Sequence, residues 1–438
     1  MHGSPALLVQ AGDRRNESPI MNAPLSCRSH ARRAITALVS AVDEPRLDEL
    51  VKLVDISMGN PVRHYHSLAH ALMVADSSDP LEVLIGLCHD IAQIEVDGGL
   101  PEGGEAWLDG FVVHDAAGGV RLIDDERTRA NRCFEIVRIG FRFAPGHVFV
   151  PFGGKNEFLS ALIAARVLEP VIGPADLAAL TVGIEATIPF RGSADDVALR
   201  ALSALEEIEQ KFGLNMYAAD RREHVRRSIR IANRDVGSFG GDDLFAFLDD
   251  TWGLMRESSP ELRYLRPIGF TAYRQTVQKM TRFLSSLRAS VVFRRFDGEP
   301  DPQSFERLLE KTAHNLEVIT AVMHVKLLAS ALLEAANSAV PTSVIPARIT
   351  APHGVTPPFS QAQTIDAVLA IGKDSAVESD MSNSPLAYRI VKSMKLDQVM
   401  ALGGAIDLAS AVGSQILEQV PRDVADAARA LARSMTRT

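Results

Sequence analysis

The chain has 438 residues, of which 46% are hydrophobic and 23% charged, a composition typical of globular proteins and not of disordered or collagen-like chains. Its 55 acidic residues outnumber 46 Lys and Arg residues, so the net charge of −9 argues against a nucleic-acid-coating protein and leaves room only for a local basic pocket. The three cysteines, Cys27, Cys88 and Cys133, fit neither a disulfide framework nor a CxxC zinc site, which favours a reducing, cytoplasmic environment.

The first residues, 1–30, have no regular apolar periodicity, and we interpret them as a loose tail. No apolar run approaches the roughly 18–20 residues that cross a bilayer, so no membrane segment is expected.

Helical periodicity dominates the next part of the chain, which we expect to be one catalytic domain over 31–260. Gly-rich residues at about 97–154 interrupt it and predict an irregular insertion with a β-hairpin, from the segments FVVHD and HVFVPF. The predicted helical segments are 31–54 (two helices, interrupted at Pro45), 61–75, 80–94 (buried all round), 156–168, 174–187, 194–231 and 242–255.

We expect residues 261–438 to form a helical C-terminal region, and we recognise no catalytic or binding motif in them. Its expected helices lie at 270–287, at 303–338 and within 384–435, and five prolines in 341–358 mark a linker. We expect the long amphipathic segment 303–338 to pack in a core, with a homodimer interface as the alternative. With no βαβ alternation, the fold class is mostly α.

Histidines and aspartates form the most informative pattern. His66 and His70 are four residues apart on a helical pattern, so both imidazoles can share one site. The adjacent pair His89 and Asp90 falls on an apolar segment, where burying both groups is costly unless they pair or bind metal. Asp235 follows much later, before a run of glycines. Two histidines and two carboxylates suit a divalent metal of intermediate hardness.

This pattern resembles the HD superfamily of metal-dependent phosphohydrolases, which combine a His, an HD dyad and a distant Asp on separate helices. YHSLAH is similar to the YHNxxH element of cyclic-nucleotide phosphodiesterases and of a bacterial group of predicted HD phosphohydrolases. KNEFLSA (155–161) resembles the NEExSA segment of that group, and IANRDVGSFG (231–240) resembles its DxDLxxLG segment. The resemblance covers roughly 61–240, and it implies an HD-type helical bundle.

Carried over to this chain, the resemblance implies four metal ligands: His70, His89, Asp90 and Asp235. His66 matches the proton donor to the leaving group. Asp90 or Asp235 would orient the attacking water. The implied cofactor is a divalent ion (Mn, Mg, Fe or Zn), one or two per chain.

Three further positions bear on a second metal. Glu157 matches the acidic residue of NEExSA. It is a candidate for a catalytic group, for a ligand of a second metal, or for a residue that hydrogen-bonds to a metal ligand. Asn233 replaces the first Asp of DxDL, so one carboxylate is lost. Glu185 could replace a ligand at a segment, EATIPF, where the bacterial group has a Thr and then a His.

The expected function is hydrolysis of a phosphate mono- or diester of a nucleotide or related small phosphorylated molecule by metal-activated water. Arg63 and Arg191 are the arginines best placed to hold the substrate phosphate. One alternative is an HD-type di-iron oxygenase, for which His114, His147 and His224 are available as extra ligands. Another is a degenerate, non-catalytic ligand-binding module.

The segment FGGDDLFAFL (239–248) resembles the GGDEF element of diguanylate cyclases. Helical patterns surround it and the other strand motifs of a cyclase are absent. We therefore interpret it as a helix stop followed by an acidic N-cap.

Overall fold

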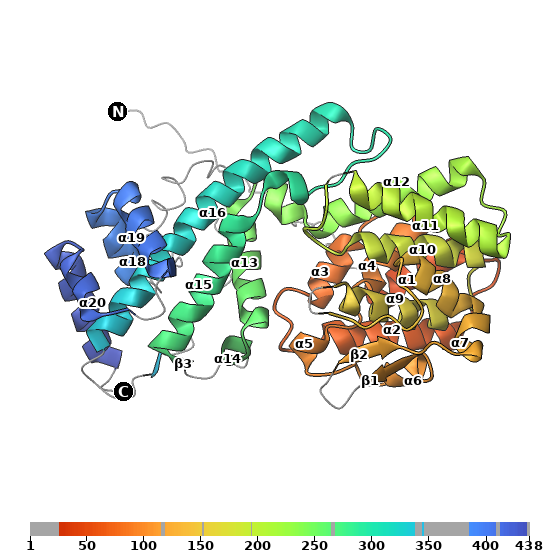
Figure 1. Ribbon diagram of the computed structural model, residues 1–438, viewed down its shortest axis with the longest axis horizontal. Helices are drawn as coiled ribbons and strands as arrows, with labels where there is room; N and C mark the ends of the chain where they lie inside the picture. The colour runs from red at the N-terminus through yellow and green to blue at the C-terminus, as the bar shows by residue number, and fades with distance from the viewer. Residues whose placement is uncertain are drawn as a thin grey trace, which may run out of the picture.

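The computed structural model describes residues 26–114, 119–150, 153–193, 195–263, 268–337, 344–345, 385–408 and 412–435. Helices dominate this part of the chain, which confirms the mostly α prediction (Figure 1). Short β-strands form two small antiparallel pairs, β1 (Val112–His114) with β2 (Val120–Leu122) and β3 (Ile268–Gly269) with β4 (Val344–Ile345).

The first core is built from helices of the N-terminal half, which pack on the right of Figure 1. Their bounds are α1 (Cys27–Leu38), α2 (Glu44–Met58), α3 (Leu68–Val74), α4 (Pro80–Cys88), α5 (Ile94–Asp97), α6 (Glu105–Leu108), α7 (Glu126–Ala130), α8 (Arg132–Gly140), α9 (Lys155–Leu168), α10 (Pro174–Ala186), α11 (Asp196–Phe212) and α12 (Ala218–Asp235).

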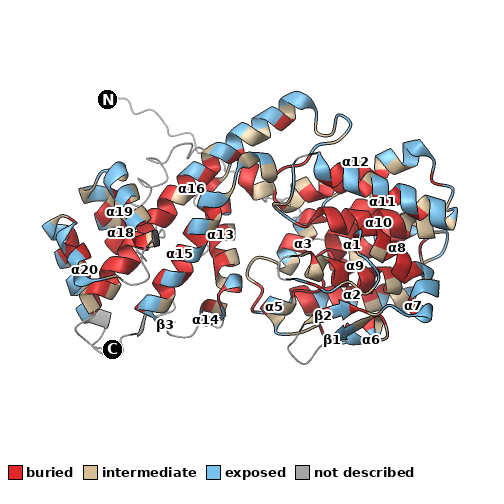
Figure 2. Cartoon of the chain, in the orientation of Figure 1, coloured by how far each residue is buried: buried red, intermediate tan, exposed pale blue. Residues whose placement is uncertain are grey.

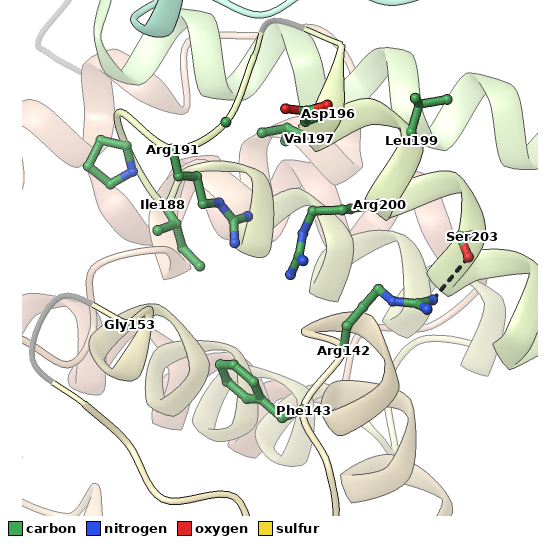
Figure 3. Close-up of a pocket in the computed structure, with 12 residues that line it drawn as sticks. Arg142, Phe143, Gly153, Ile188, Arg191, Asp196, Val197, Leu199, Arg200 and Ser203 are labelled. Atoms are coloured by element: carbon green, nitrogen blue, oxygen red, sulfur yellow. Dashed lines mark hydrogen bonds between the residues drawn. The ribbon is translucent and has the colours of Figure 1, made fainter. Parts of the chain in front are cut away.

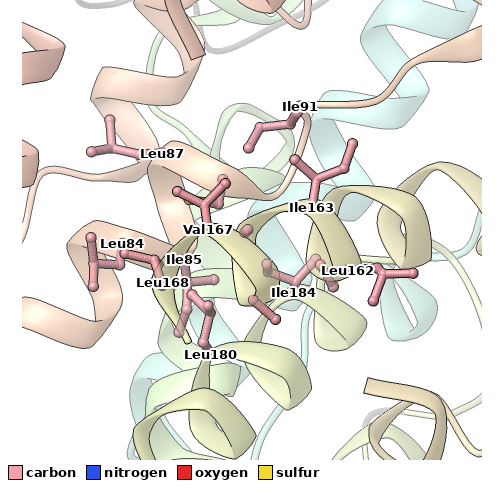
Figure 4. Close-up of a cluster of buried hydrophobic side chains, with 14 of the residues drawn as sticks. Leu84, Ile85, Leu87, Ile91, Leu162, Ile163, Val167, Leu168, Leu180 and Ile184 are labelled. Atoms are coloured by element: carbon pink, nitrogen blue, oxygen red, sulfur yellow. The ribbon is translucent and has the colours of Figure 1, made fainter. Parts of the chain in front are cut away.

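Helices α4, α9 and α10 form the centre of this core. They are apolar on nearly every side, as the sequence predicts for 80–94, and Figure 4 shows Ile85, Val167 and Ile184 among the side chains that meet between them. A helix that is apolar all round is stable only when other elements cover it on every side. Figure 2 shows the resulting red interior under an exposed rim formed by α7, α11 and α12.

The second core, on the left of Figure 1, begins after α12 and does not share residues with the first. Its elements are η1 (Gly237–Gly240), α13 (Leu244–Ser258), α14 (Pro260–Arg263), α15 (Phe270–Ser286), η2 (Ala289–Val291), α16 (Pro302–Asn337), α18 (Pro385–Ser393), α19 (Leu396–Leu408), η4 (Ser414–Glu418) and α20 (Arg422–Met435). The buried residues of the first core extend along the chain to Ile231, and those of the second begin at Val236.

Helix α16 is the central helix of the second core. By length and composition it could cross a membrane, which corrects the expectation that no apolar run is long enough. In the structure 89% of its 18-residue apolar window is buried inside the protein, and α15, α19 and α20 pack against it. The prediction that this segment packs in a core is confirmed.

Several local predictions differ from the structure for identifiable reasons. The chain is helical from Cys27, because the side chain of Ser26 caps α1, so the tail ends before residue 30. The single helix predicted over 194–231 is two helices, since Gly213 adopts φ 59° and ends α11. The predicted insertion contains the hairpin β1–β2, but also the amphipathic helix α8.

Two turn predictions are confirmed. Pro45 stands in the first turn of α2, where a missing N–H costs nothing, and Asp43 caps that helix. The Gly-Gly-Asp-Asp segment (240–243) begins at the last residue of the 3₁₀ helix η1 and ends at the N-cap Asp243, whose carboxylate accepts from the amides of Phe245 and Ala246. The proline-rich segment 341–358 lies outside the described residues, except for 344–345.

Candidate metal centre

Three helix ends bring the predicted ligands together. His70 lies in the first turn of α3, where the Ser67 hydroxyl caps the helix by accepting from the His70 amide. His89 is the C-cap of α4, and Asp235 is the last residue of α12. Side chains at helix ends can converge without breaking the apolar packing between the helices.

Helix α12 is held on α4 by charged groups that also place Asp235. The buried carboxylate of Glu82 pairs with Arg230 at 2.5 Å and with Arg234 at 2.9 Å, and the hydroxyl of Ser77 donates to it at 2.7 Å. A buried carboxylate is tolerated because its oxygens are satisfied by cations and a hydroxyl. These bonds fix the last turn of α12 beside the end of α4.

The ligand atoms of His70, His89 and Asp235 all lie within 4.8 Å of one another. The distance from Asp235 Oδ1 is 2.9 Å to His70 Nε2 and 3.4 Å to His89 Nε2. All three side chains are nearly buried, with at most 13% of their surface exposed. Imidazole nitrogens and a carboxylate at this spacing match the ligand types of a divalent transition metal.

In its neutral form, His89 presents a lone pair to this cluster. Its Nδ1 lies 2.9 Å from the carbonyl oxygen of Gly86, which can only accept a hydrogen bond, so Nδ1 carries the proton. In the neutral ring Nε2 is then the unprotonated nitrogen that faces Asp90 and Asp235. A backbone carbonyl that fixes the tautomer in this way is characteristic of metal-binding histidines.

Two buried atoms at the cluster lack a hydrogen bond. His89 Nε2 and Asp90 Oδ2 lie 3.0 Å apart, but neither makes a directed hydrogen bond with any described group. Leaving such atoms unsatisfied costs free energy, and a cation between them would remove that cost. The donor set and its two unsatisfied atoms therefore fit a divalent metal ion.

The charges of the cluster are strongly coupled. Burial alone would lower the pKa of His89, but the carboxylates of Asp90 and Asp235 outweigh it and raise that pKa well above its usual value. Burial would likewise raise the pKa of Asp235, yet its close contacts with His70 and His89 lower that pKa to about 2. In the absence of an ion, protonated His89 thus balances the carboxylates.

Asp90 is oriented by a chain of amides. Gln93 Nε2 donates to Asp90 Oδ1 at 2.8 Å, and Asn156 Nδ2 donates to Gln93 Oε1 at 3.0 Å. Asn156 belongs to the KNEFLSA segment, and Ser160 of the same segment accepts from the Ala92 amide at 2.9 Å. This segment therefore supports the turn that carries His89 and Asp90.

Arg63 corrects one sequence prediction. Its side chain is fully buried, pairs with Asp97 at 2.5 Å and donates to the carbonyl oxygens of Asp90 at 2.6 Å and Ile91 at 3.1 Å. All of these contacts are internal to the protein. Arg63 therefore holds the His89–Asp90 turn in place rather than binding a substrate phosphate.

His66 does not share a helix with His70, contrary to the spacing argument, because α3 begins only at Leu68. The two rings are nevertheless neighbours, with centroids 6.2 Å apart. His66 Nδ1 lies 2.6 Å from Glu257 Oε2, and Glu257 Oε1 accepts from the amides of Tyr65 and His66 at 2.5 and 3.0 Å. Burial lowers the pKa of His66, but the charges of Asp90 and Glu257 outweigh it and raise that pKa to about 9.

Glu257 is a site residue that the sequence analysis missed. It lies near the end of α13, its side chain is 1% exposed, and it belongs to the second core rather than to the first. Helix α13 also contains Asp249 and Asp250, so an acidic residue in this helix does not by itself single out Glu257. Nothing in its spacing connects it with His66, 191 residues earlier.

Glu157 lies close to the cluster but outside the set of three ligands. Burial of its carboxyl group raises its pKa to about 7; the negative charge of Asp90 acts in the same direction, and the positive charges of Arg191 and His66 oppose it. A carboxyl group with this pKa can exchange a proton near neutral pH.

Glu185 and Asn233 are occupied by other partners. Glu185 Oε1 pairs with Arg191 at 2.5 Å and with Arg200 at 3.3 Å. Asn233 exchanges two hydrogen bonds with the backbone of Arg294, at 2.9 and 2.7 Å. In this structure neither side chain belongs to the cluster, and Arg191 binds Glu185 instead of facing the three ligands.

Two of the histidines considered for a di-iron site, His147 and His224, have other partners in the described part of the chain. His147 stacks on the ring of Phe143, with centroids 4.1 Å apart. His224 Nδ1 accepts a hydrogen bond from Arg227 at 2.8 Å. The side chain of His114 lies outside the described part of the chain.

Comparisons with known proteins add no relative to this description. No family model matches the chain, and no curated protein or solved structure does so either.

Proposed function

We propose that this protein is an HD-type, metal-dependent hydrolase of phosphate esters of small molecules. The observation that carries the proposal is the convergence of His70, His89 and Asp235 within 4.8 Å, beside a histidine that is hydrogen-bonded to a buried carboxylate. Metal ligands next to a positioned proton donor are the parts that hydrolysis of a phosphate ester needs.

His70, His89 and Asp235 would hold the ion, and Asp90 Oδ2 lies 3.0 Å from His89 Nε2 as a fourth candidate ligand. A divalent ion supplies Lewis-acid chemistry, since it polarises a phosphoryl oxygen and lowers the pKa of coordinated water from 15.7 to about 7. Asp90, oriented by Gln93, is placed to accept a hydrogen bond from an attacking water.

His66 is the proposed general acid. Its raised pKa, about 9, keeps the ring protonated at neutral pH, as a group that must give a proton requires. Because Nδ1 is bonded to Glu257, Nε2 is the nitrogen that can protonate a leaving oxygen. Glu257 fixes the ring orientation and stabilises its positive charge. Glu157, with a pKa of about 7, is a second group suited to proton transfer beside Asp90.

The test separates metal binding from proton donation. His70→Ala should lose bound Mn²⁺ and all hydrolysis of nitrophenyl phosphate, because it removes a ligand. His66→Ala should keep the metal and lose ~10²–10⁴-fold in rate on esters with poor leaving groups, but far less on nitrophenyl esters, whose leaving group departs without a proton. His30→Ala, in α1, is the matched control and should change neither quantity.

Metal content and rates on both ester types decide the matter. Full metal occupancy in His70→Ala, or loss of metal in His66→Ala, would overturn the assignment of roles. Stoichiometric iron with oxygen uptake and no ester hydrolysis would point to an oxygenase instead.

A further inference from the structure

A pocket of about 690 Å³ opens between the segments that follow α8 and α10, Gly153 just before α9, and the first turns of α11. Three arginines line it, Arg142, Arg191 and Arg200, and Figure 3 shows the guanidinium groups of Arg191 and Arg200 pointing into the space above Phe143. The pocket does not include any of the metal-cluster residues. We propose that it binds a phosphorylated small molecule, with the phosphate held by these arginines.

The carboxylates near the pocket do not supply enough hydrogen-bond acceptors for its arginines. Arg191 and Arg200 share a single oxygen of Glu185, and the other oxygen, Oε2, and Arg191 Nε are buried without a hydrogen bond. Arg200 keeps 43% of its side chain exposed. Guanidinium groups bind phosphate oxygens through paired, charge-assisted hydrogen bonds, so an entering phosphate would supply acceptors that Glu185 does not.

Arg142 is weakly partnered by the protein. It donates to the Ser203 hydroxyl at 3.0 Å and lies 3.5 Å from the exposed carboxylate of Glu207, a distance at which an exposed ion pair contributes little. Asp196, the acidic residue of the wall, is engaged by the Ser193 amide at 2.6 Å.

A fourth arginine adds to the positive charge. Arg294 is buried close to Arg191, and burial together with the charge of Arg191 lowers the pKa of Arg294 to about 10. Arg294 does not line the pocket, but its charge adds to that of the three arginines on the wall.

Backbone geometry also favours a binding role for Arg142. It adopts φ 56° just after α8, a left-handed conformation in which glycine is usual and a larger side chain is strained. A strained residue on the wall of a pocket is often found at a ligand-binding site.

The rest of the wall is apolar and fits the uncharged part of such a ligand. This part of the wall is formed by Phe143, Ile188, Pro189 and Val197. The volume of the pocket lies within the roughly 300–1,000 Å³ that is usual for small-molecule sites. An organic phosphate can therefore use both the arginines and the apolar surface, whereas inorganic phosphate can use only the arginines.

Calorimetric titration of the full chain in EDTA tests the proposal, with phenyl phosphate and inorganic phosphate as probes. Phenyl phosphate should bind with a Kd about tenfold lower than inorganic phosphate, because part of its ring is buried. Arg200→Gln and Arg142→Gly should each raise the Kd of phenyl phosphate about tenfold or more. Arg142→Gly also relieves the left-handed backbone, so loss of fold would not explain its effect.

Two controls distinguish this site from the metal cluster. Arg129→Gln, an exposed arginine paired with Asp124 elsewhere in the first core, should leave the Kd unchanged. His70→Ala should also leave it unchanged, since binding is measured without metal. Absence of saturable binding in EDTA, equal Kd values in all arginine variants, or loss of binding in His70→Ala would overturn the proposal. None of these outcomes depends on whether the protein hydrolyses esters.

Discussion

His224 illustrates how the direction of one hydrogen bond fixes the protonation of a side chain. Arg227 can only donate, so His224 Nδ1 must accept and the ring is neutral. Burial, and then the charge of Arg227, lower the pKa of His224 to about 4. Protonation would break this bond and place two cations side by side.

The pH dependence of stability follows from that shift. The folded pKa of about 4 lies below the unfolded value of 6.5, so unfolded chains bind the proton more readily and stability falls as the pH drops below 6.5. Between pH 7 and pH 5 the loss from this one residue is about 2 kcal/mol. Urea denaturation at both pH values should show that His224→Gln loses about 2 kcal/mol less of its free energy of unfolding between pH 7 and pH 5 than the parent protein does. The same pH dependence in both proteins would show that His224 does not titrate as described.

At the metal cluster, the sequence identified the candidate ligands better than it identified the contacts of the residues around them. His70, His89 and Asp235 are recognisable because their spacing and their apolar context leave few other uses for them. Arg63 and Glu257 were misjudged or missed for a common reason. The role of each depends on one partner, Asp97 or His66, and local periodicity does not indicate which distant residue a buried charge will meet.

At the scale of elements, the metal cluster depends on close contact between helices. Gly86 lies where α4 crosses the end of α3, and a Cβ atom at Gly86 would come within 2.6 Å of the Ala75 backbone nitrogen. On the opposite side Gly183 of α10 approaches Ile85, with a Cβ atom 2.3 Å from its Cδ1. These two glycines allow α4 to sit between α3 and α10, so that His70 and His89 meet.

Gly86→Ala should therefore disturb both stability and metal binding. The clash is with backbone atoms, which cannot rotate away, so α3 must move relative to α4 at a cost of about 1–3 kcal/mol. That movement carries His70 away from His89 and should weaken Mn²⁺ binding. Urea denaturation in EDTA and a metal titration measure the two effects.

Gly404→Ala is the matched control, because Gly404 also lies within a helix and a Cβ atom there would have no neighbour within 4 Å. This change should stabilise the chain by up to about 1 kcal/mol and leave metal binding unaffected. Unchanged metal affinity in Gly86→Ala would mean that the helix crossing does not position the ligands.

Most helices could be predicted from apolar periodicity, including both central helices, α4 and α16, since burial imposes a pattern on every turn. The start of α3 could not, because the amides of Tyr65 and His66 are satisfied by Glu257 instead of by helix carbonyls. Helix α8 was hidden by the Gly-rich segments on either side of it. The pairing of β3 with β4 joins residues 75 and 77 positions apart, and such short strands have no periodicity to detect.

At the scale of the whole molecule, the second core contributes to the site formed by the first. Helix α13 packs with the second core, yet it touches the turn before α3 at two points. Glu257 binds Tyr65 and His66, and Gly253 lies against His64, where a Cβ atom would be 3.1 Å from its carbonyl oxygen. The second core therefore positions the proposed general acid through α13.

The final prediction tests this coupling with Glu257→Gln. Glutamine keeps the size of the side chain and one acceptor oxygen, but it removes the negative charge that binds two amides and stabilises protonated His66. The variant should keep bound Mn²⁺ and lose ~10²–10⁴-fold in rate on esters with poor leaving groups, as His66→Ala does. Hydrogen exchange at the Tyr65 and His66 amides should accelerate, because their charged acceptor is gone.

The double variant His66→Ala/Glu257→Gln distinguishes a positioning role from general destabilisation. If Glu257 acts through His66, the combined loss of rate should be no greater than that of His66→Ala alone, because residues in one network are not additive. Gln278→Glu is the control for general destabilisation, because it makes the reverse change in α15, inside the second core and away from His66. It should lower the stability of the protein without changing how the rate depends on the leaving group of the ester. If the loss of rate in the double variant equals the product of the losses in the two single variants, Glu257 affects the rate by a route other than His66.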